Sequence, residues 1–290
     1  MGIASLKQTP QDWITQQWVI LFGKKIILDE DEWLVGPFGN TDGIGQKFIE
    51  QLATKENLEI DKSGDKRGLL QSIDQLNLPQ QDVAILSKQV IDFYENTGGY
   101  EFDLKVIWNP FFRIFDGLLK VFFSNRIQQL NLPTENTANS EALNSEIICL
   151  VDKNTKQLQR TIWLRTFRMS EQVVYSGVYE TCTIPSGKTC IKAIFPLPNG
   201  NATVILKPTV GNNGELILES SGEKMGDSGF YFLLKDSKGV LWTKYIRSFR
   251  DTLVVRSENG IIKAEQTLTL GKLRVLTFEY NIKKIINNSN

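Results

Sequence analysis

The sequence predicts an α+β protein: a helical N-terminal part followed by a large antiparallel β-sheet of about 10–11 strands, barrel-like or strongly curled. Three observations support this fold class. Apolar residues recur at helical spacing before residue 130. After residue 145, short alternating segments are separated by Gly, Asn and Pro. Two segments 82 residues apart resemble each other, which indicates a duplicated β-unit.

The internal repeat is clearest where Trp163-Leu-Arg-Thr-Phe-Arg168 aligns with Tyr245-Ile-Arg-Ser-Phe-Arg250. The similarity predicts two units of four or five strands each, at residues 146–207 and 227–283. Two such units would pair naturally as halves of one barrel, because closure removes exposed strand edges. A two-sheet sandwich is the alternative.

The domain organisation follows from a change of composition. Residues 131–145 are rich in Pro, Thr, Asn, Ser and Glu, so they are the best candidate boundary. We expect residues 1–135 to form a mainly helical region that packs on the sheet. Residues 146–285 are expected to form an antiparallel β domain with the internal repeat, and the two parts to make one structural unit.

The N-terminal part contains several segments with helical periodicity. The most apolar of them, residues 111–130, has only a narrow polar stripe, so we expect a central core helix. A helix lying in a membrane interface is the alternative for this segment. The other expected elements are helices at residues 46–54, 68–76 and 80–94, a short strand at 23–28 and a strand at 100–108.

The C-terminal part has a β pattern almost to its end. Its separators, such as Pro-Asn-Gly-Asn and Glu-Asn-Gly, are typical of antiparallel hairpins. The expected strands are residues 146–151, 158–168, 173–183, 189–195, 202–207, 215–220, 229–235, 240–250, 252–256, 261–270 and 273–282.

Composition excludes several classes of chemistry. Histidine is absent, so there is no Ser-His-Asp or Cys-His system and no histidine-ligated zinc. Three cysteines cannot supply a zinc site of four thiolates, and we expect Cys182 and Cys190 to be reduced thiols on adjacent strands. No metal or cofactor is predicted. Lys plus Arg equals Asp plus Glu, at 33 each, which gives no electrostatic case for nucleic acid.

The N-terminal residues lack the basic start and apolar core of a secretory signal. No run reaches the roughly 18 apolar residues of a membrane span. The cytoplasm is therefore the expected location, and no transmembrane segment is expected.

The repeated stretches contain the candidate ligand-binding residues. Because side chains alternate along a strand, three residues of each copy share one face. If that face lines a cavity, its arginine would bind a ligand carboxylate or phosphate. The alternative is that both guanidinium groups reach outward to solvent over the aromatic rings. The residues are Trp163, Arg165 and Phe167 in the first copy, and Tyr245, Arg247 and Phe249 in the second.

Three short segments carry a resemblance to known proteins. They are Phe93-Tyr-Glu-Asn-Thr97, Arg126-Ile-Gln-Gln-Leu-Asn-Leu-Pro133 and Phe195-Pro-Leu-Pro-Asn-Gly200. From about residue 34 onward, the chain resembles a family of uncharacterised bacterial proteins. The resemblance implies a bacterial protein and supplies no activity, cofactor or site.

The favoured functional hypothesis is a non-catalytic cytoplasmic protein that binds a small amphipathic or anionic, lipid-like ligand inside the curled sheet. Its basis is the β-rich body, the repeated aromatic–Arg pattern and the missing histidine. The alternatives are an enzyme that uses carboxylates in the same cavity, and a membrane-peripheral or protein-interaction module that uses residues 111–123.

Overall fold

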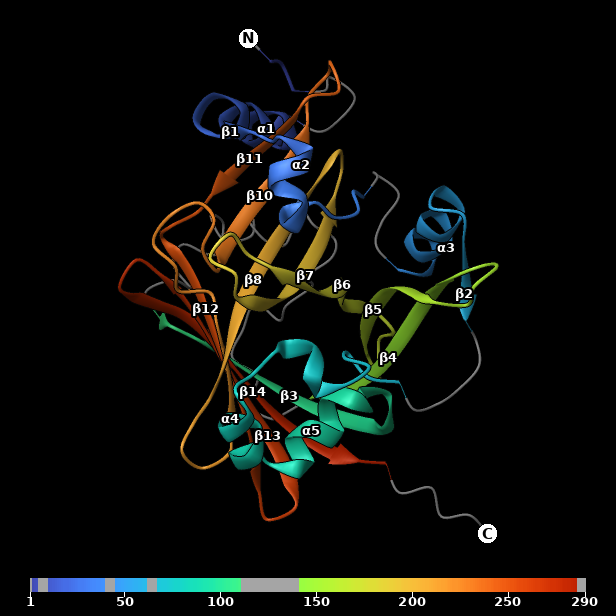
Figure 1. Ribbon diagram of the computed structural model, residues 1–290, viewed down its shortest axis with the longest axis vertical. Coiled ribbons are helices and arrows are strands. Elements are labelled where there is room, and N and C mark those ends of the chain that lie inside the picture. The colour runs from blue at the N-terminus through green and yellow to red at the C-terminus, as the bar shows by residue number, and fades with distance from the viewer. Residues whose placement is uncertain (1, 5–9, 40–44, 62–66, 111–140, 286–290) are drawn as a thin grey trace.

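The fold is α+β, as the sequence predicts, with helices in the N-terminal part and a 14-stranded antiparallel sheet that curls into a barrel (Figure 1). The computed structural model describes residues 2–4, 10–39, 45–61, 67–110 and 141–285. The predicted helix at residues 111–130, together with its membrane-interface alternative, lies outside the described residues.

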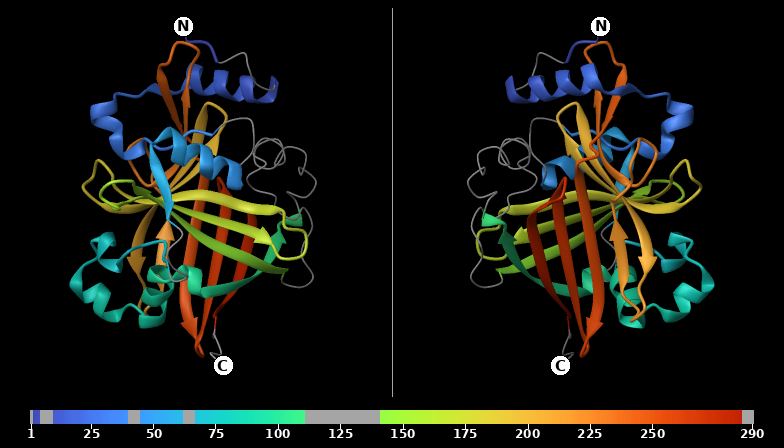
Figure 2. Two further views of the ribbon diagram at one scale, coloured as in Figure 1. Left: turned by 90° about the vertical axis from the view of Figure 1, so that its right-hand side faces the viewer. Right: turned by 90° about the vertical axis from the view of Figure 1, so that its left-hand side faces the viewer.

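Ten strands close into the barrel, and the side views show them curling around a common interior (Figure 2). The barrel strands are β3 (Tyr100–Trp108), β4 (Glu141–Asp152), β5 (Leu158–Phe167), β6 (Val173–Thr183), β7 (Thr189–Leu197), β8 (Gly200–Val210), β9 (Leu216–Glu219), β12 (Phe249–Glu258), β13 (Ile261–Leu270) and β14 (Leu273–Lys284). Closure occurs at β9, which pairs with residues 207–210 of β8 on one side and with residues 252–255 of β12 on the other.

Three further strands extend the sheet away from the barrel. The first half of β8 pairs with β10 (Gly229–Lys235), which pairs with β11 (Leu241–Tyr245), and β1 (Lys24–Lys25) completes the edge. We call β10, β11 and β1 the arm. Helix α1 (Pro10–Phe22) packs on the arm through a small hydrophobic cluster and forms the end of the molecule that is farthest from the barrel (Figures 1 and 2).

The remaining N-terminal elements pack around the barrel. Helix α3 (Gln46–Lys55) and strand β2 (Leu58–Asp61) cover β4, β5 and β6 through a second hydrophobic cluster. Helix α5 (Lys88–Glu95) contributes to the largest cluster, whose other members come mainly from the barrel interior. The short elements are α2 (Leu28–Asp31), η1 (Glu32–Leu34), η2 (Ile73–Leu76), α4 (Gln80–Ile85) and η3 (Thr97–Gly99).

Several local predictions are wrong. The predicted helix 80–94 is interrupted after Ile85, because Leu86 turns into the core and the Ser87 N–H donates to the Gly214 carbonyl rather than continuing the helix. The predicted helix 68–76 has only a 3₁₀ turn, since its first residues run along the end of α5, where the Leu70 N–H donates to Tyr94. Helix α1 was not expected.

The two repeated stretches adopt different structures. The first is one continuous strand, β5, in the barrel. The predicted strand 240–250 is wrong, because a turn at Arg247 and Ser248 divides it into β11 of the arm and β12 of the barrel. The turn carries the chain from one part of the sheet to the other, so the two stretches are not equivalent strands.

The start of β8 requires a glycine because β10 approaches closely. A Cβ atom at Gly200 would lie 2.4 Å from the Leu233 carbonyl oxygen, whereas a Cβ at Gly99 would meet nothing within 4 Å. We predict that Gly200→Ala lowers the free energy of unfolding by about 1–3 kcal/mol. Gly99→Ala, the matched control, should stay within about 1 kcal/mol of wild type. Urea denaturation measures both, and equal midpoints for the two variants would contradict the prediction.

Candidate functional site

The barrel interior contains a cavity of about 150 Å³ that is lined mainly by apolar and aromatic side chains. The choice of lining residues follows from strand alternation, since residues two apart on each strand point to the same face. On β12 the lining residues are Phe249, Asp251, Leu253 and Val255. Leu69, Leu70, Phe93 and Tyr94 of the N-terminal part also contribute to the lining.

A buried arginine lies in this apolar lining. The Arg165 side chain is 6% exposed, and its Cζ atom is 4.2 Å from the ring centroid of Trp163 and 5.6 Å from that of Tyr280. Cation–π contacts of this kind contribute roughly 0.5–2 kcal/mol each, with the higher values for desolvated pairs. The two rings therefore stabilise a positive charge at the cavity wall.

The ring under the guanidinium is itself held in place. The Trp163 Nε1–H donates to Ser145 Oγ at 2.8 Å, and its ring centroid is 5.6 Å from that of Phe102 and 5.5 Å from that of Tyr179. Because its rotamer is fixed on several sides, Trp163 holds the Arg165 side chain in a defined position.

Two further polar side chains face the cavity, Asp251 from β12 and Gln266 from β13. The Gln266 Nε2–H donates to Asp251 Oδ2 at 2.7 Å, while Asp251 Oδ1 is buried and has no hydrogen-bond partner among the described residues. Burial raises the pKa of Asp251 to about 7, and the hydrogen bond from Gln266 acts in the opposite direction. Asp251 therefore changes its protonation state near neutral pH.

The cavity also meets an ion-pair network. Glu180 belongs to the lining, and its carboxylate is held by Arg160 and by Lys192, whose Nζ lies 3.0 Å from Glu180 Oε2. Lys192 Nζ also donates to the Val35 carbonyl at 2.9 Å. The two cations offset the charge of Glu180. Because Lys192 also bonds to Val35, the network ties the N-terminal segment to the barrel wall.

The structure separates the predicted site residues. Trp163, Arg165 and Phe249 line the cavity, and half-buried Phe167 packs against the same core. Arg247, the counterpart of Arg165 in the second copy, is exposed in the turn before β12.

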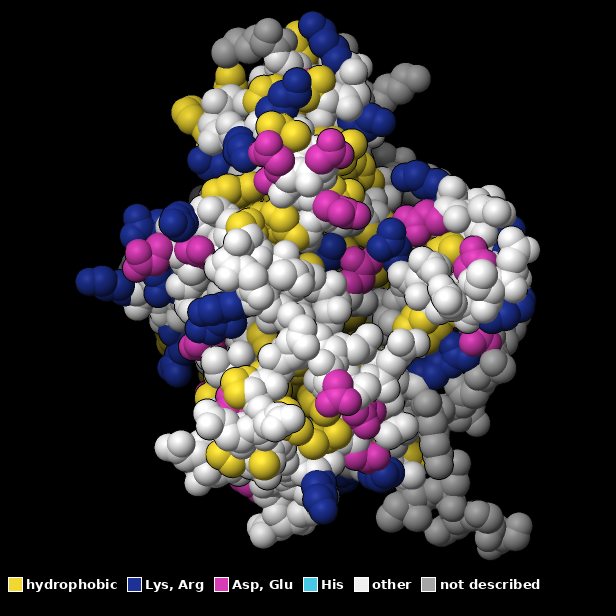
Figure 3. All heavy atoms as spheres, in the orientation of Figure 1, with side chains coloured by type: hydrophobic (Ala, Val, Ile, Leu, Met, Phe, Trp, Pro, Cys, Tyr) yellow, Lys and Arg dark blue, Asp and Glu magenta, His cyan; other side chains and the backbone are white. Residues whose placement is uncertain are grey.

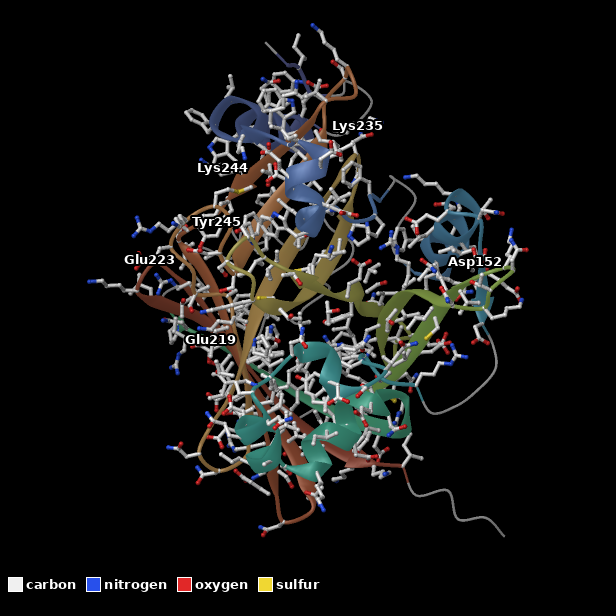
Figure 4. All side chains as sticks on the ribbon, in the orientation of Figure 1. Asp152, Glu219, Glu223, Lys235, Lys244 and Tyr245 are labelled. Carbon is white, nitrogen blue, oxygen red and sulfur yellow. The ribbon has the colours of Figure 1, made fainter. Side chains whose placement is uncertain are left out.

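Tyr245 also lies away from the cavity, on the arm (Figure 4). Its ring centroid is 5.0 Å from that of Tyr231, and its hydroxyl donates to the Gly222 carbonyl at 2.5 Å. Thus the first copy contributes its Trp and Arg to the cavity, whereas the second contributes only its Phe.

Sequence reasoning missed Asp251, Gln266 and Tyr280. The signal for Asp251 is its parity, because it lies two residues after Phe249, which the sequence did single out. Gln266 and Tyr280 lie on neighbouring strands, and only the pairing of β12, β13 and β14 brings them to the same wall.

The cysteines are not reactive groups of this site. Cys182 and Cys190 are paired residues on β6 and β7, as predicted, and both are free and buried. Burial raises the pKa of Cys182 to about 11 and that of Cys190 to about 12, so both remain protonated thiols at neutral pH. Among the described residues no three Cys, Asp or Glu side chains gather in a way that could hold a metal ion.

Comparisons with known proteins supply little beyond this geometry. No family model matches the chain, and no solved structure matches it. A protein of Bacillus subtilis (strain 168), named "Uncharacterized membrane protein YndJ", is 26% identical over 244 residues, which cover 83% of this chain. The chain spans 42% of the length of that relative. This similarity confirms the resemblance to an uncharacterised bacterial protein.

Within the described ranges, no helix is both long enough and apolar enough to cross a membrane.

The raised pKa of Asp251 predicts a pH-dependent stability. The folded carboxyl keeps its proton up to about pH 7, whereas the unfolded one releases it near 3.8, so the free energy of unfolding falls as the pH rises between these values. The decline approaches about 1.4 kcal/mol per pH unit. Asp251→Asn should remove this contribution.

Urea denaturation of wild type and Asp251→Asn at pH 5, 6, 7 and 8 measures the effect. The difference between the two free energies should move in favour of the variant from pH 5 to 7 and level off towards pH 8, above the pKa of the folded carboxyl. A difference that stays constant across this range would contradict the assignment.

Proposed function

We propose that the protein is a non-catalytic, cytoplasmic ligand-binding protein whose barrel cavity holds a small amphipathic molecule with one anionic group. The observation that carries the proposal is the buried guanidinium of Arg165 in a cavity wall whose described residues are mainly apolar and aromatic. A planar guanidinium is suited to bidentate recognition of a carboxylate. An apolar body attached to that carboxylate would contact the aliphatic and aromatic lining.

The size of the cavity restricts the ligand. An internal apolar space of 150 Å³ is known to accept benzene, whereas sites for drug-sized molecules are roughly 300–1,000 Å³. A cavity of about 150 Å³ therefore favours a compact carboxylate, such as benzoate or a medium-chain fatty acid, over a two-chain lipid.

Asp251 gives the proposed site a dependence on pH. When Asp251 is protonated, it adds no negative charge to the cavity wall that contains Arg165, so the wall is more favourable to an anion. When Asp251 ionises, its negative charge opposes a bound carboxylate in a region of low dielectric constant. Protonated Asp251 can also donate its O–H to a ligand oxygen, so anion binding and proton binding support each other.

The proposed location rests on the thiols. Cys149, Cys182 and Cys190 are all free and buried, and free thiols persist in a reducing compartment. The cytoplasm is such a compartment.

The role of Arg165 can be tested with a matched pair of ligands and a matched pair of variants. We expect wild type to bind octanoate, and Arg165→Met to weaken this binding roughly 10- to 100-fold because a charged hydrogen-bond donor is lost. Arg247→Met, at the counterpart position in the repeat, should bind octanoate as wild type does. Octanol, which has the same chain without the charge, should distinguish the variants little.

Isothermal titration calorimetry measures these affinities, and native mass spectrometry of gently purified protein detects any ligand that is already bound. Equal octanoate affinity in wild type and Arg165→Met would reject the proposed site. An absence of binding by octanoate and benzoate, with a bare protein mass and no lipid in the organic extract, would reject the proposed function.

The role of Asp251 predicts a distinct pH profile. Octanoate affinity of wild type should fall several-fold as the pH rises from 6 to 8, because Asp251 loses its proton in this interval. Asp251→Asn, which stays neutral, should bind octanoate with an affinity that varies little over the same interval. Calorimetric titrations at three pH values provide the comparison, and parallel profiles for the two proteins would show that another group is responsible.

A further inference from the structure

The exposed hydrophobic side chains are concentrated at one end of the molecule. Seven of the twelve large hydrophobic side chains that are exposed in the described part of the chain belong to the first 28 residues. Scattered apolar side chains are normal on a protein surface, but a concentration of this kind marks a contact surface. The seven are Ile3, Ile14, Trp18, Leu21, Phe22, Ile27 and Leu28.

Helix α1 presents apolar side chains on two sides. Val19 and Ile20 are 1% and 4% exposed, and they pack with Leu234 on the arm. Positions 14, 18, 21 and 22 recur at spacings of three and four residues, so they share another side of the helix. Ile14 and Phe22 are each 63% exposed there. Packing on the arm therefore accounts for only part of the apolar surface of α1.

Lysine side chains border this exposed side. Lys244 Nζ donates to the Phe22 carbonyl at 2.7 Å and lies 5.8 Å from the Trp18 ring centroid. Lys24 and Lys25 follow one residue after the helix ends. Figure 3 shows hydrophobic and basic side chains interleaved at this end, and Figure 4 places Lys235 and Lys244 there.

The nearest acidic side chains do not cancel this arrangement. Asp31 is buried and lies 3.7 Å from Lys24, so it offsets the charge of that lysine and not that of Lys25 or Lys244. Helix α2, which carries Asp29 and Glu30, lies closer to the barrel than α1 does (Figures 1 and 2). The surface farthest from the barrel is thus apolar at its centre and basic at its border.

We propose that this end of the molecule docks on the surface of a bilayer that contains anionic lipids. Helices that lie in a membrane interface combine an apolar face with lysines that border it. Trp side chains favour the headgroup level, and lysines near the surface attract anionic headgroups. In this arrangement Ile14, Trp18, Leu21 and Phe22 enter the interface, while Lys25 and Lys244 contact headgroups. The site is separate from the barrel cavity and does not depend on its ligand.

Vesicle co-sedimentation tests the apolar part of the surface. Wild type should pellet with phosphatidylcholine vesicles that contain 30% phosphatidylglycerol, and much less with phosphatidylcholine alone. The double variant Trp18→Ser, Phe22→Ser should lose this binding. The matched control Met169→Ser, Leu273→Ser removes two exposed hydrophobic side chains elsewhere and should pellet as wild type does. Circular dichroism checks that all three proteins are folded.

A lysine substitution tests the basic border in the same vesicle assay. Lys25→Gln should weaken binding to the anionic vesicles about fivefold, the effect expected of one lysine near an anionic surface, and high salt should reduce the difference. The proposal is overturned if wild type fails to pellet with anionic vesicles. It is also overturned if light scattering shows a wild-type dimer that Trp18→Ser, Phe22→Ser dissociates while vesicle binding is unchanged. That result would assign the surface to a second copy of the chain.

Discussion

The two-part pairing of β8 is the constraint on which the rest of the structure depends. One edge of β8 pairs with β7 along most of its length. The other edge is shared, because residues 200–205 pair with β10 and residues 207–210 pair with β9. A strand edge satisfies its hydrogen-bonding groups with one partner at each position, so two partners must diverge where they meet. One partner closes the barrel, and the other leads into the arm.

Three local arrangements explain why ionisable groups are tolerated inside the closed barrel. An unpaired charge in a dry interior is expensive, so buried charges are paired, ring-stacked or neutralised. Arg165 lies over Trp163 and near Tyr280, and Glu180 is held between Arg160 and Lys192. Asp251 follows the third route, since burial favours its neutral form. The cavity lining therefore contains a ring-stacked cation and a carboxyl whose charge depends on pH.

The sequence predicts the fold class well because its signals are local. Turn residues and alternation define most barrel strands, and nearly every predicted strand has a counterpart in the structure. The failures arise where tertiary contacts override local pattern. Residues 240–250 alternate like the continuous strand β5, yet the chain must leave the arm and enter the barrel there, so it turns at Arg247. No local property of the residues indicates that turn.

Only the part of the candidate site that comes from the first repeat copy was predictable, because the rest depends on tertiary contacts. Parity along a strand predicts that Trp163 and Arg165 share a face, but it does not say which face is interior. The second copy has the same parity, yet Arg247 is exposed and Tyr245 packs on the arm. Gln266 approaches Asp251 from the next strand, so its contribution depends on register and not on sequence spacing. Sequence similarity between the two stretches thus reflects shared strand chemistry more than shared surroundings.

The cavity wall and the hydrophobic cluster that holds α1 share one side chain among the described residues. Phe232 of β10 lines the cavity and also packs against the cluster that holds α1 on the arm. Its neighbour in the chain, Leu233, belongs to a third cluster on the opposite face of the arm. Because protein interiors are close-packed, a change in the packing of α1 is felt at Phe232, and a change in the cavity is felt there too. The arm is therefore packed continuously with the barrel, and the Phe232 ring joins the α1 cluster to the cavity wall.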